Sequence, residues 1–463
     1  MLDFSFEPYR QEMLEALKNF LKIESVKGES HPNMPYGKGI FDALMFIQST
    51  AEDMDLDCVN LFGHLAYIDY GYGDEMLGIL THLDVVPEGE GWTMPAFEGV
   101  EKDGKIFGRG AIDDKGPCIA ALYAIKALSD NCVQLNKKVR LIIGADEESG
   151  WADMDFYKKH EPLPDIAFSP DGEYPVINAE KGLMHVELRI KGLEDGGALS
   201  IKSLKAGTRI NVVPNKAQAL ICAPFDLIQK SLGRYRCPIG AELSAQDIGG
   251  GFVAIVSVGK SAHGSRPEQG INAASALLQY LGTLPWSPGM TGEAVYVLAS
   301  KIGTYYNGEA AELNLEDQES GKLTMNLGTL SLNDGELKAG IDIRYPISIQ
   351  RQVVEEKLQK HFGNLFEITY KHTLDAHFVS EGSPLVTALK EAYTEITGED
   401  AYCISIGGAT YARAFENAVT FGSLFPGQPN VEHGPDEYIE IESLMKNAEI
   451  IANAIIKLCG ESI

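Results

Sequence analysis

The chain has 463 residues, of which 44% are hydrophobic and 23% are charged, as in ordinary folded globular proteins. This composition excludes a disordered chain, and the 48 glycines and 21 prolines follow no fibrous repeat. With 39 Lys and Arg against 66 Asp and Glu, the formal net charge is −27. Such a field repels phosphate backbones and anionic lipids, so we expect neither a nucleic acid nor a membrane surface as partner.

The sequence also bears on the compartment. The longest apolar runs fall well short of the roughly 18–20 residues that cross a bilayer, and the N-terminus is acidic where a signal peptide is basic. The seven cysteines stand apart without a CxxC pair, which fits a reducing compartment and neither a disulfide framework nor a thiolate zinc site. We therefore expect a cytoplasmic protein.

The first part of the chain alternates helix and strand patterns. Apolar residues at helical spacing predict a helix over residues 7–26. Short apolar runs predict strands at 76–81, 139–145 and 165–169, and residues 115–129 predict a helix between the first two. Strand–helix–strand units of these lengths indicate a largely parallel sheet.

From residue 181 the strand patterns outnumber the helix patterns. Five strands are predicted at 184–190, 216–221, 252–258, 322–330 and 336–344, and two amphipathic helices at 271–284 and 350–362. This pattern is typical of an α+β unit on an antiparallel sheet. After residue 382 the first pattern returns, with helices at 384–397 and 441–458 and a strand at 418–424.

The simplest architecture is one α/β domain interrupted by another. We predict a catalytic domain over residues 1–180 and 383–463, with a central, mostly parallel sheet flanked by helices. The inserted α+β lid domain, built on an antiparallel sheet, covers residues 181–382.

Polar residues stand where the predicted apolar strands end or where a helix begins: His82 and Asp84, Asp113, Glu147 and Glu148, Asp171, and His433 after the strand at 418–424. Open α/β sheets place their ligand crevice at the carboxyl ends of the strands. Taken singly, each residue also suits a turn or a helix cap, and Asp113 could cap the helix at 115–129. Together, five such places favour a functional site.

Metal binding explains these residue types best. Two histidines and three carboxylates without sulfur suit two Zn²⁺, Co²⁺ or Mn²⁺ ions that share a carboxylate and a water. Asp113 could bridge the two ions through its two oxygens. His82 with Asp171, and Glu148 with His433, would then complete the two sites.

Two acidic residues remain beside this ligand set. Adjacent strand residues point in opposite directions, so Glu147 could face the metal-bound water while Glu148 ligates. It could take a proton from that water and return it to a leaving amine. Asp84 lies on the same side of the chain as His82 and could accept the second imidazole N–H, which would orient the ligand.

Three segments resemble the signatures of the dinuclear-metal peptidase family that holds aminoacylase, carnosinase, glutamate carboxypeptidase and the succinyl-diaminopimelate desuccinylases. They are residues 81–87 (THLDVVP), 108–116 (GRGAIDDKG) and 146–150 (DEESG). Residues 168–176 (FSPDGEYPV), 207–214 (GTRINVVP) and 259–263 (GKSAH) are similar to its bacterial Xaa-His dipeptidase, carnosinase-like branch. The resemblance extends over essentially the whole chain, the lid included.

The resemblance implies a role for each site residue. Asp113 would bridge the metals, its peptide bond to Asp114 would be cis, and Glu147 would be the general acid and base. In the lid, His263 would hydrogen-bond the oxyanion of the tetrahedral intermediate. Asn211 and Arg344 would hold the C-terminal carboxylate of the substrate, which the guanidinium of Arg344 can bind through two N–H bonds.

We therefore predict a metal-dependent dipeptidase that hydrolyses dipeptides with a free C-terminal carboxylate. The nucleophile would be a water that bridges two divalent ions, and Zn²⁺ is the ion we expect most. A lid of this length suggests that one chain supplies the whole site, so a monomer is expected. Two alternatives remain open. The same metals could serve an N-acyl amino acid deacylase or desuccinylase, or the fold could be kept by a non-catalytic peptide-binding protein.

Overall fold

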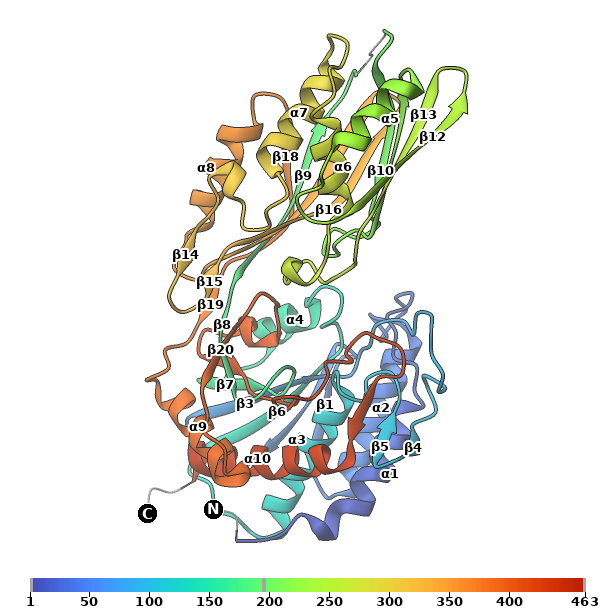
Figure 1. Ribbon diagram of the computed structural model, residues 1–463. Helices are drawn as coiled ribbons and strands as arrows, with labels where there is room; N and C mark the ends of the chain where they lie inside the picture. Colours follow the sequence, from blue (N-terminus) through green and yellow to red (C-terminus); the bar gives the residue numbers. More distant parts are fainter. Residues whose placement is uncertain (1–2, 194–196, 461–463) are drawn as a thin grey trace. The chain divides into compact units, whose positions relative to one another are not determined.

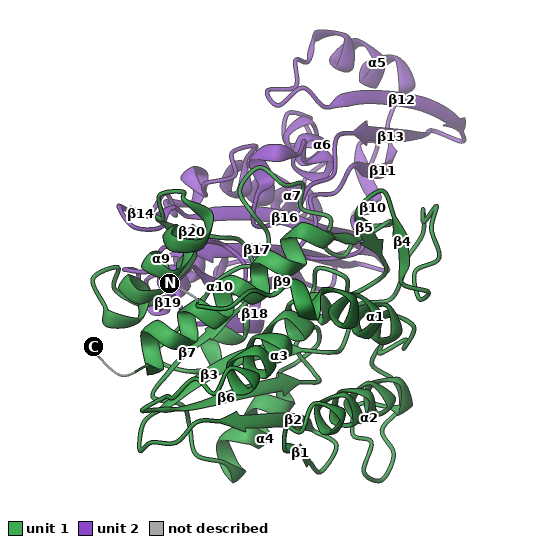
Figure 2. Cartoon of the chain, turned by 90° about the horizontal axis from the view of Figure 1, so that it is seen from below, with its two compact units in different colours: residues 1–178, 378–404, 409–463 green, residues 179–377, 405–408 purple. Residues whose placement is uncertain are grey.

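The computed structural model describes residues 3–193 and 197–460. Their contacts divide the chain into two compact units, which Figure 2 colours separately. Unit 1 holds residues 1–178, 378–404 and 409–463, and unit 2 holds residues 179–377 and 405–408. The domain boundaries drawn from the sequence, at 181 and 382, lie a few residues from these limits, and the segment 405–408 was assigned to the catalytic domain.

A nine-stranded sheet contains the strands that precede the candidate metal ligands. Its order is β1-β2-β6-β3-β7-β21-β8-β19, with β20 paired to β8. The strands are β1 (Cys58–Leu61), β2 (Leu65–Tyr70), β3 (Met76–His82), β6 (Lys138–Gly144), β7 (Ile166–Ser169), β8 (Val176–Glu180), β19 (His377–Phe378), β20 (Cys403–Ile406) and β21 (Ala418–Thr420). β6, β3, β7 and β21 are parallel, and antiparallel strands flank them.

Helices cover both faces of this sheet (Figure 1). They are α1 (Arg10–Leu21), α2 (Lys38–Asp53), α3 (Lys115–Asp130), α4 (Ala152–His160), α9 (Pro384–Thr397) and α10 (Ile441–Cys459). Ile79 packs in the larger apolar core with α1, α2, α3, α9 and α10, whereas its neighbour Leu80 packs with α4. Successive strand residues face opposite sides, so a strand buried on both sides is a continuous apolar run, as β3 is.

Unit 2 is built on an eight-stranded antiparallel sheet of order β12-β13-β11-β10-β16-β17-β9-β18. The strands are β9 (Gly182–Ile190), β10 (Ser200–Ala206), β11 (Lys216–Cys222), β12 (Glu242–Gly249), β13 (Phe252–Val258), β16 (Thr324–Asn333), β17 (Glu336–Tyr345) and β18 (Glu367–Leu374). Its core takes alternate strand residues together with helices α5 (Phe225–Arg234), α6 (Ala273–Leu281), α7 (Met290–Ile302) and α8 (Arg351–Phe362). The remaining strands are the pair β14 (Glu316–Asp317) and β15 (Gly321–Lys322), and β4 (Val100–Lys102), β5 (Lys105–Phe107) and β22 (Tyr438–Glu440).

The predicted fold class is confirmed: a parallel-centred α/β sheet with helices on both faces, and a separate antiparallel sheet with helices. Several elements differ from prediction. The strand expected at 418–424 ends at Thr420, and the helix expected over 7–26 is α1, which ends at Leu21. Helices α2, α4, α5 and α7 were not predicted from the sequence, so unit 2 has four α-helices among its described residues where two were expected. No helix in the described ranges is both long enough and apolar enough to cross a bilayer.

Candidate metal centre and active site

The parallel strands bring the predicted metal ligands to one edge of the sheet. His82 is the last residue of β3, Glu147 and Glu148 follow β6, and Asp171 follows β7. Asp113 lies just before α3, and its peptide bond to Asp114 is cis, as the family resemblance implied. Because β3 is parallel to both β6 and β7, the carboxyl ends of all three strands lie together.

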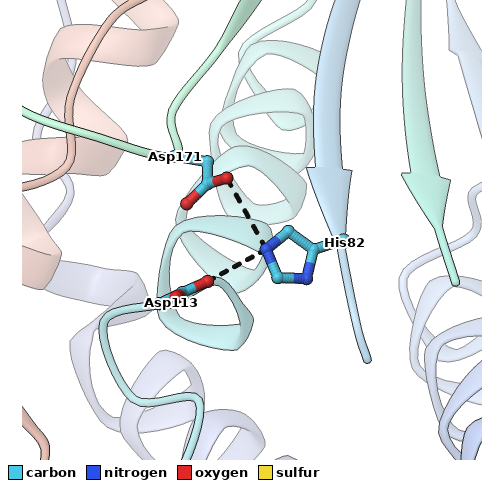
Figure 3. Close-up of side chains that lie close together, drawn as sticks. All are labelled: His82, Asp113 and Asp171. Carbon is cyan, nitrogen blue, oxygen red and sulfur yellow. Dashed lines mark ion pairs between the residues drawn. The ribbon is translucent and has the colours of Figure 1, made fainter. Parts of the chain in front are cut away.

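His82, Asp113 and Asp171 form a first group of candidate ligands (Figure 3). The Nε2 atom of His82 lies 3.0 Å from Oδ1 of Asp113 and 3.6 Å from Oδ2 of Asp171. The Nδ1 atom of the same ring lies 2.9 Å from the main-chain carbonyl oxygen of Asp84, which can only accept a hydrogen bond. The hydrogen of the neutral ring therefore belongs on Nδ1, and the lone pair of Nε2 faces two carboxylates.

That arrangement fits a cation. Nε2 of His82 is buried and has no hydrogen-bond partner among the described residues. A buried lone pair directed at carboxylate oxygens is repelled by them unless a positive ion lies between them. The donor set, nitrogen and oxygen without sulfur, is one that Zn²⁺, Co²⁺ and Mn²⁺ accept. The residues present thus fit a divalent metal.

A second group contains Asp113, Glu148 and His433. Nε2 of His433 lies 2.9 Å from Oδ2 of Asp113 and 3.0 Å from Oε1 of Glu148. Asp113 belongs to both groups and presents a different oxygen to each histidine. A carboxylate placed in this way can bridge two ions.

The electrostatics of the cluster point to missing positive charge. Burial, and then the charge of Asp113, raise the pKa of Glu148 to about 7. Burial likewise raises the pKa of Glu147 well above its ordinary value. Burial opposes ionisation of Asp113 too, but the adjacent His433 and His82 outweigh it and hold the pKa of Asp113 far below its usual range. The carboxylates together need more positive charge than the two imidazoles supply, and divalent ions would supply it.

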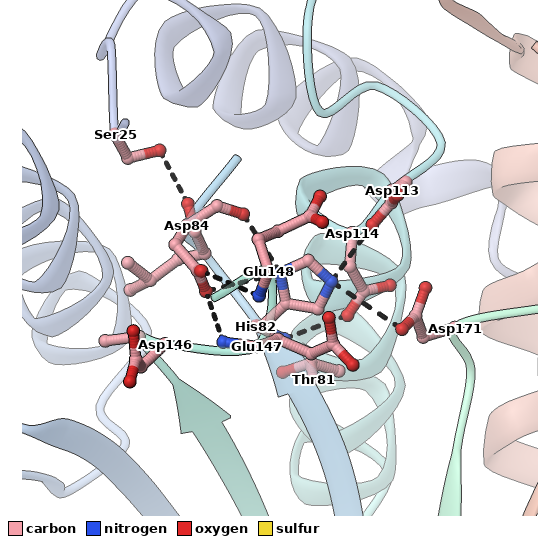
Figure 4. Close-up of polar contacts among 12 residues, drawn as sticks. Ser25, Thr81, His82, Asp84, Asp113, Asp114, Asp146, Glu147, Glu148 and Asp171 are labelled. Carbon is pink, nitrogen blue, oxygen red and sulfur yellow. Dashed lines mark hydrogen bonds and ion pairs between the residues drawn. The ribbon is translucent and has the colours of Figure 1, made fainter. Parts of the chain in front are cut away.

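The structure gives Asp84 a different set of partners from the one predicted. We expected its carboxylate to accept the second N–H of His82, but that N–H donates to the Asp84 carbonyl, and the carboxylate oxygen lies 3.5 Å away. The two carboxylate oxygens instead accept the backbone N–H groups of Glu147 and Glu148, at 3.1 Å each (Figure 4). Asp84 therefore fixes the backbone of the Glu147–Glu148 pair, which sequence spacing alone does not reveal.

A buried ion pair that the sequence did not indicate joins the segments of Asp113 and His433. Glu437, four residues after His433, lies 2.5 Å from Nη1 of Arg109, and both side chains are 1% exposed. Its other oxygen accepts the backbone N–H groups of Ile112 and Asp113, at 3.0 and 3.3 Å. Nothing in the sequence singled out Glu437.

A second positioning contact holds the end of β6. The carboxylate of Asp153 accepts the backbone N–H groups of Ala145 and Asp146, at 2.6 and 3.1 Å, and the hydroxyl of Tyr411. A Cβ atom on Gly144 would lie 2.5 Å from the Tyr411 ring, so only glycine fits there. These contacts fix the direction in which the chain leaves β6 toward Glu147.

The predicted substrate-binding residues all belong to unit 2. The segment of His263 and Gly264 lies beside Asn211, since the Gly264 N–H donates to the Asn211 carbonyl at 2.7 Å. Arg344 is the penultimate residue of β17 and is bound by Asp342 and by the carbonyl of Gly407. Nδ1 of His263 lies 2.7 Å from the hydroxyl of Ser265. The roles of Asn211, His263 and Arg344 toward a substrate stay predictions.

The chain is similar to a known protein family and to known proteins over most of its length. The model of peptidase family M20/M25/M40 matches residues 78–457. The YtjP protein of Bacillus subtilis (strain 168) is 36% identical over 457 residues, covering 97% of each chain. The Beta-Ala-Xaa dipeptidase of Lactobacillus delbrueckii subsp. lactis is 32% identical over 457 residues, covering 98% of this chain and 97% of the other.

A solved structure shares the fold at low sequence identity. Human carnosine dipeptidase 1 aligns with a TM-score of 0.61 at 14% identity, over 98% of this chain and 97% of the other. At this identity the likeness concerns the fold alone.

Proposed function

Because the chain belongs to peptidase family M20/M25/M40, as its motifs indicated, we propose that it is a metal-dependent dipeptidase. The observation that carries the proposal is the pair of ligand groups that share Asp113, with Glu147 directly before the candidate ligand Glu148 in the chain. The 32% identity to a Beta-Ala-Xaa dipeptidase over nearly the whole of both chains supports a dipeptide substrate. A deacylase or desuccinylase on the same metals is the less favoured alternative.

We propose two divalent ions, Zn²⁺ first, with Mn²⁺ or Co²⁺ as alternatives. His82 and Asp171 would hold one ion, Glu148 and His433 the other, and Asp113 both. When bound, such ions lower the pKa of water toward about 7 and polarise a carbonyl group.

The residues of unit 1 are suited to proton transfer. Glu147, whose raised pKa reflects its burial, is proposed to take a proton from the attacking water and to deliver it to the nitrogen of the departing amine. Asp84 would hold the backbone of Glu147 during both transfers, through the N–H bond at 3.1 Å. His82 and His433 would stay neutral, as metal-ligating histidines must.

Three residues of unit 2 are proposed as substrate-binding residues. Arg344 and Asn211 would bind its free C-terminal carboxylate, and His263 would donate a hydrogen bond to the oxyanion. The seven cysteines, all unpaired, support the cytoplasm as compartment. We propose that one chain carries the whole site and acts as a monomer.

The test combines elemental analysis with assays on purified protein. We expect about two metal ions per chain, hydrolysis of free dipeptides, loss of activity with a chelator and recovery when Zn²⁺ or Mn²⁺ is returned. N-acetyl and N-succinyl amino acids assayed beside the dipeptides separate the alternative. Preferential hydrolysis of the N-acyl compounds would reject the dipeptidase assignment.

A further inference from the structure

Asp342 is a buried acid for which the proposed reaction has no role. It lies on β17, is 0% exposed, and is two residues before Arg344, which is 4% exposed. Residues two apart on a strand share a face, so both side chains belong to the same side of the sheet. A carboxylate is rarely fully buried unless it is paired, and here its partner is the proposed substrate-binding arginine.

Asp342 binds Arg344 through two parallel hydrogen bonds. Nε of Arg344 donates to Oδ1 at 2.8 Å, and Nη2 donates to Oδ2 at 3.0 Å. Nη1 donates to the carbonyl of Gly407, which lies beside the aliphatic stem, since a Cβ on Gly407 would lie 3.6 Å from Cγ of Arg344. The guanidinium has five N–H bonds, so the contacts of the described residues leave one on Nη1 and one on Nη2 for a ligand.

Asp342 also contacts the backbone next to Asn211. A Cβ on Gly264 would lie 2.6 Å from Oδ2 of Asp342 and 2.9 Å from the Asn211 carbonyl oxygen. Asn326, on the neighbouring strand, donates to the carbonyls of Ile210 and Val212, at 3.2 Å each. Asp342 therefore lies at the point where the Arg344 side chain and the Asn211 segment meet.

A second arginine in the chain shows what a purely structural pair looks like. Arg140 has the same two bonds to Asp69, at 2.7 Å each, but its Nη1 donates to the carboxylate of Glu161 at 2.9 Å and to the hydroxyl of Tyr157. Arg140 thus forms ion pairs with two carboxylates. Arg344 has one carboxylate and one neutral carbonyl, which leaves charge and N–H groups for another anion.

We propose that Asp342 is a positioning residue that sets the preference for substrates with a free C-terminal carboxylate. By binding the Nε side of the guanidinium, it directs the two remaining N–H bonds toward the substrate carboxylate and prevents the long side chain from adopting other rotamers. This inference rests on the proposed function, in which Arg344 binds that carboxylate.

The experiment compares a free dipeptide with its C-terminal amide as substrates of Asp342→Asn. Loss of the paired bonds should lower kcat/KM for the free dipeptide by about 10- to 100-fold, mainly through KM, because a hydrogen bond to a charged group is disturbed. The amide has no carboxylate to bind, so its kcat/KM should stay near that of the unaltered protein, as should the metal content.

The matched control is Asp69→Asn, which makes the same change in the Arg140 pair. It should lower the free energy of unfolding without changing the ratio of the kcat/KM values for the free dipeptide and its amide. Gly264→Ala is a second variant, since its Cβ would lie 2.6 Å from the Asp342 carboxylate and 2.9 Å from the Asn211 carbonyl, and would displace both without removing the charge of Asp342. It should shift the ratio in the same direction, so the proposal can be tested even if Asp342→Asn does not fold.

Two outcomes overturn the inference. The first is an equal loss of kcat/KM for the free dipeptide and for its amide. The second is an unchanged ratio of these two kcat/KM values in both Asp342→Asn and Gly264→Ala. The proposed function fails separately, when the unaltered protein does not hydrolyse dipeptides or when Arg344→Ala leaves the ratio of the two substrates unchanged.

Discussion

Arg109 and Glu437 form a buried ion pair at 2.5 Å, and through it the segment of His433 is fastened to the segment of Asp113. Asp436 adds to this connection, because its carboxylate accepts the backbone N–H groups of Thr93 and Met94 and the Thr93 hydroxyl. The spacing of two candidate metal ligands far apart in sequence therefore depends on acids that bind no metal themselves.

Glu437→Gln should weaken both the fold and the second ligand group. The change leaves the charge of Arg109 buried without its partner, which typically costs about 3–5 kcal/mol of the free energy of unfolding. Denaturant unfolding measures this loss, and competition with a chelator measures the accompanying fall in metal affinity. Glu442→Gln is the control on an exposed acid, expected to stay within about 0.5 kcal/mol. Unchanged metal affinity in a destabilised Glu437→Gln would show that the pair serves the fold alone.

Substitutions of the ligands should separate the two metal groups. Asp113 belongs to both, so Asp113→Asn should lose most of the bound metal, whereas Asp171→Asn and Glu148→Gln should each lose about one ion per chain. Elemental analysis after dialysis measures the content. Asp155→Asn, on the exposed face of α4, should retain the full content. Equal metal content in all four variants would contradict the assignment of the ligands.

Glu147→Ala should lose activity and keep its metals. Removal of a general acid and base typically lowers kcat by about 10²- to 10⁴-fold, and Glu147 is not a member of either ligand group. Steady-state kinetics and elemental analysis on the same preparation measure both quantities. Turnover close to that of the unaltered protein would remove Glu147 from the reaction.

His64 should make stability depend on pH outside the metal centre. Burial lowers the pKa of His64 from its ordinary value of 6.5, and the nearby His160 lowers it further. Below pH 6.5 the unfolded chain then binds a proton that the folded chain resists, so this part of the stability is present above pH 6.5 and is lost as the pH falls toward the lower folded pKa.

We therefore expect His64→Gln to flatten the fall in unfolding free energy just below pH 6.5. Urea unfolding at a series of pH values measures the slope. His31→Gln, at an exposed position, should retain the slope of the unaltered protein. An identical slope in His64→Gln would assign the dependence to other groups.

Some helices and strands could be predicted from the sequence because their hydrophobic periodicity is clear. β3 and α9 are a continuous apolar run and an amphipathic stretch that begins with Ser383 as its cap, and both were located to within one residue. Helix α4 was missed because its nine residues are mostly polar, and Met154 and Tyr157 are its only fully buried apolar side chains. Short elements of that kind form only through tertiary packing.

The sequence by itself determined the candidate residues of the site, because apolar strands that end in His or Asp, and the motif around Asp113, are local patterns. Only the tertiary structure decided which atoms face one another. In the structure the His82 N–H donates to the main-chain carbonyl of Asp84 instead of its carboxylate. Glu437 forms an ion pair with Arg109, and Asp342 forms one with Arg344. Such contacts depend on how the whole backbone packs, since a buried polar group takes whichever partner the neighbouring segments bring within reach.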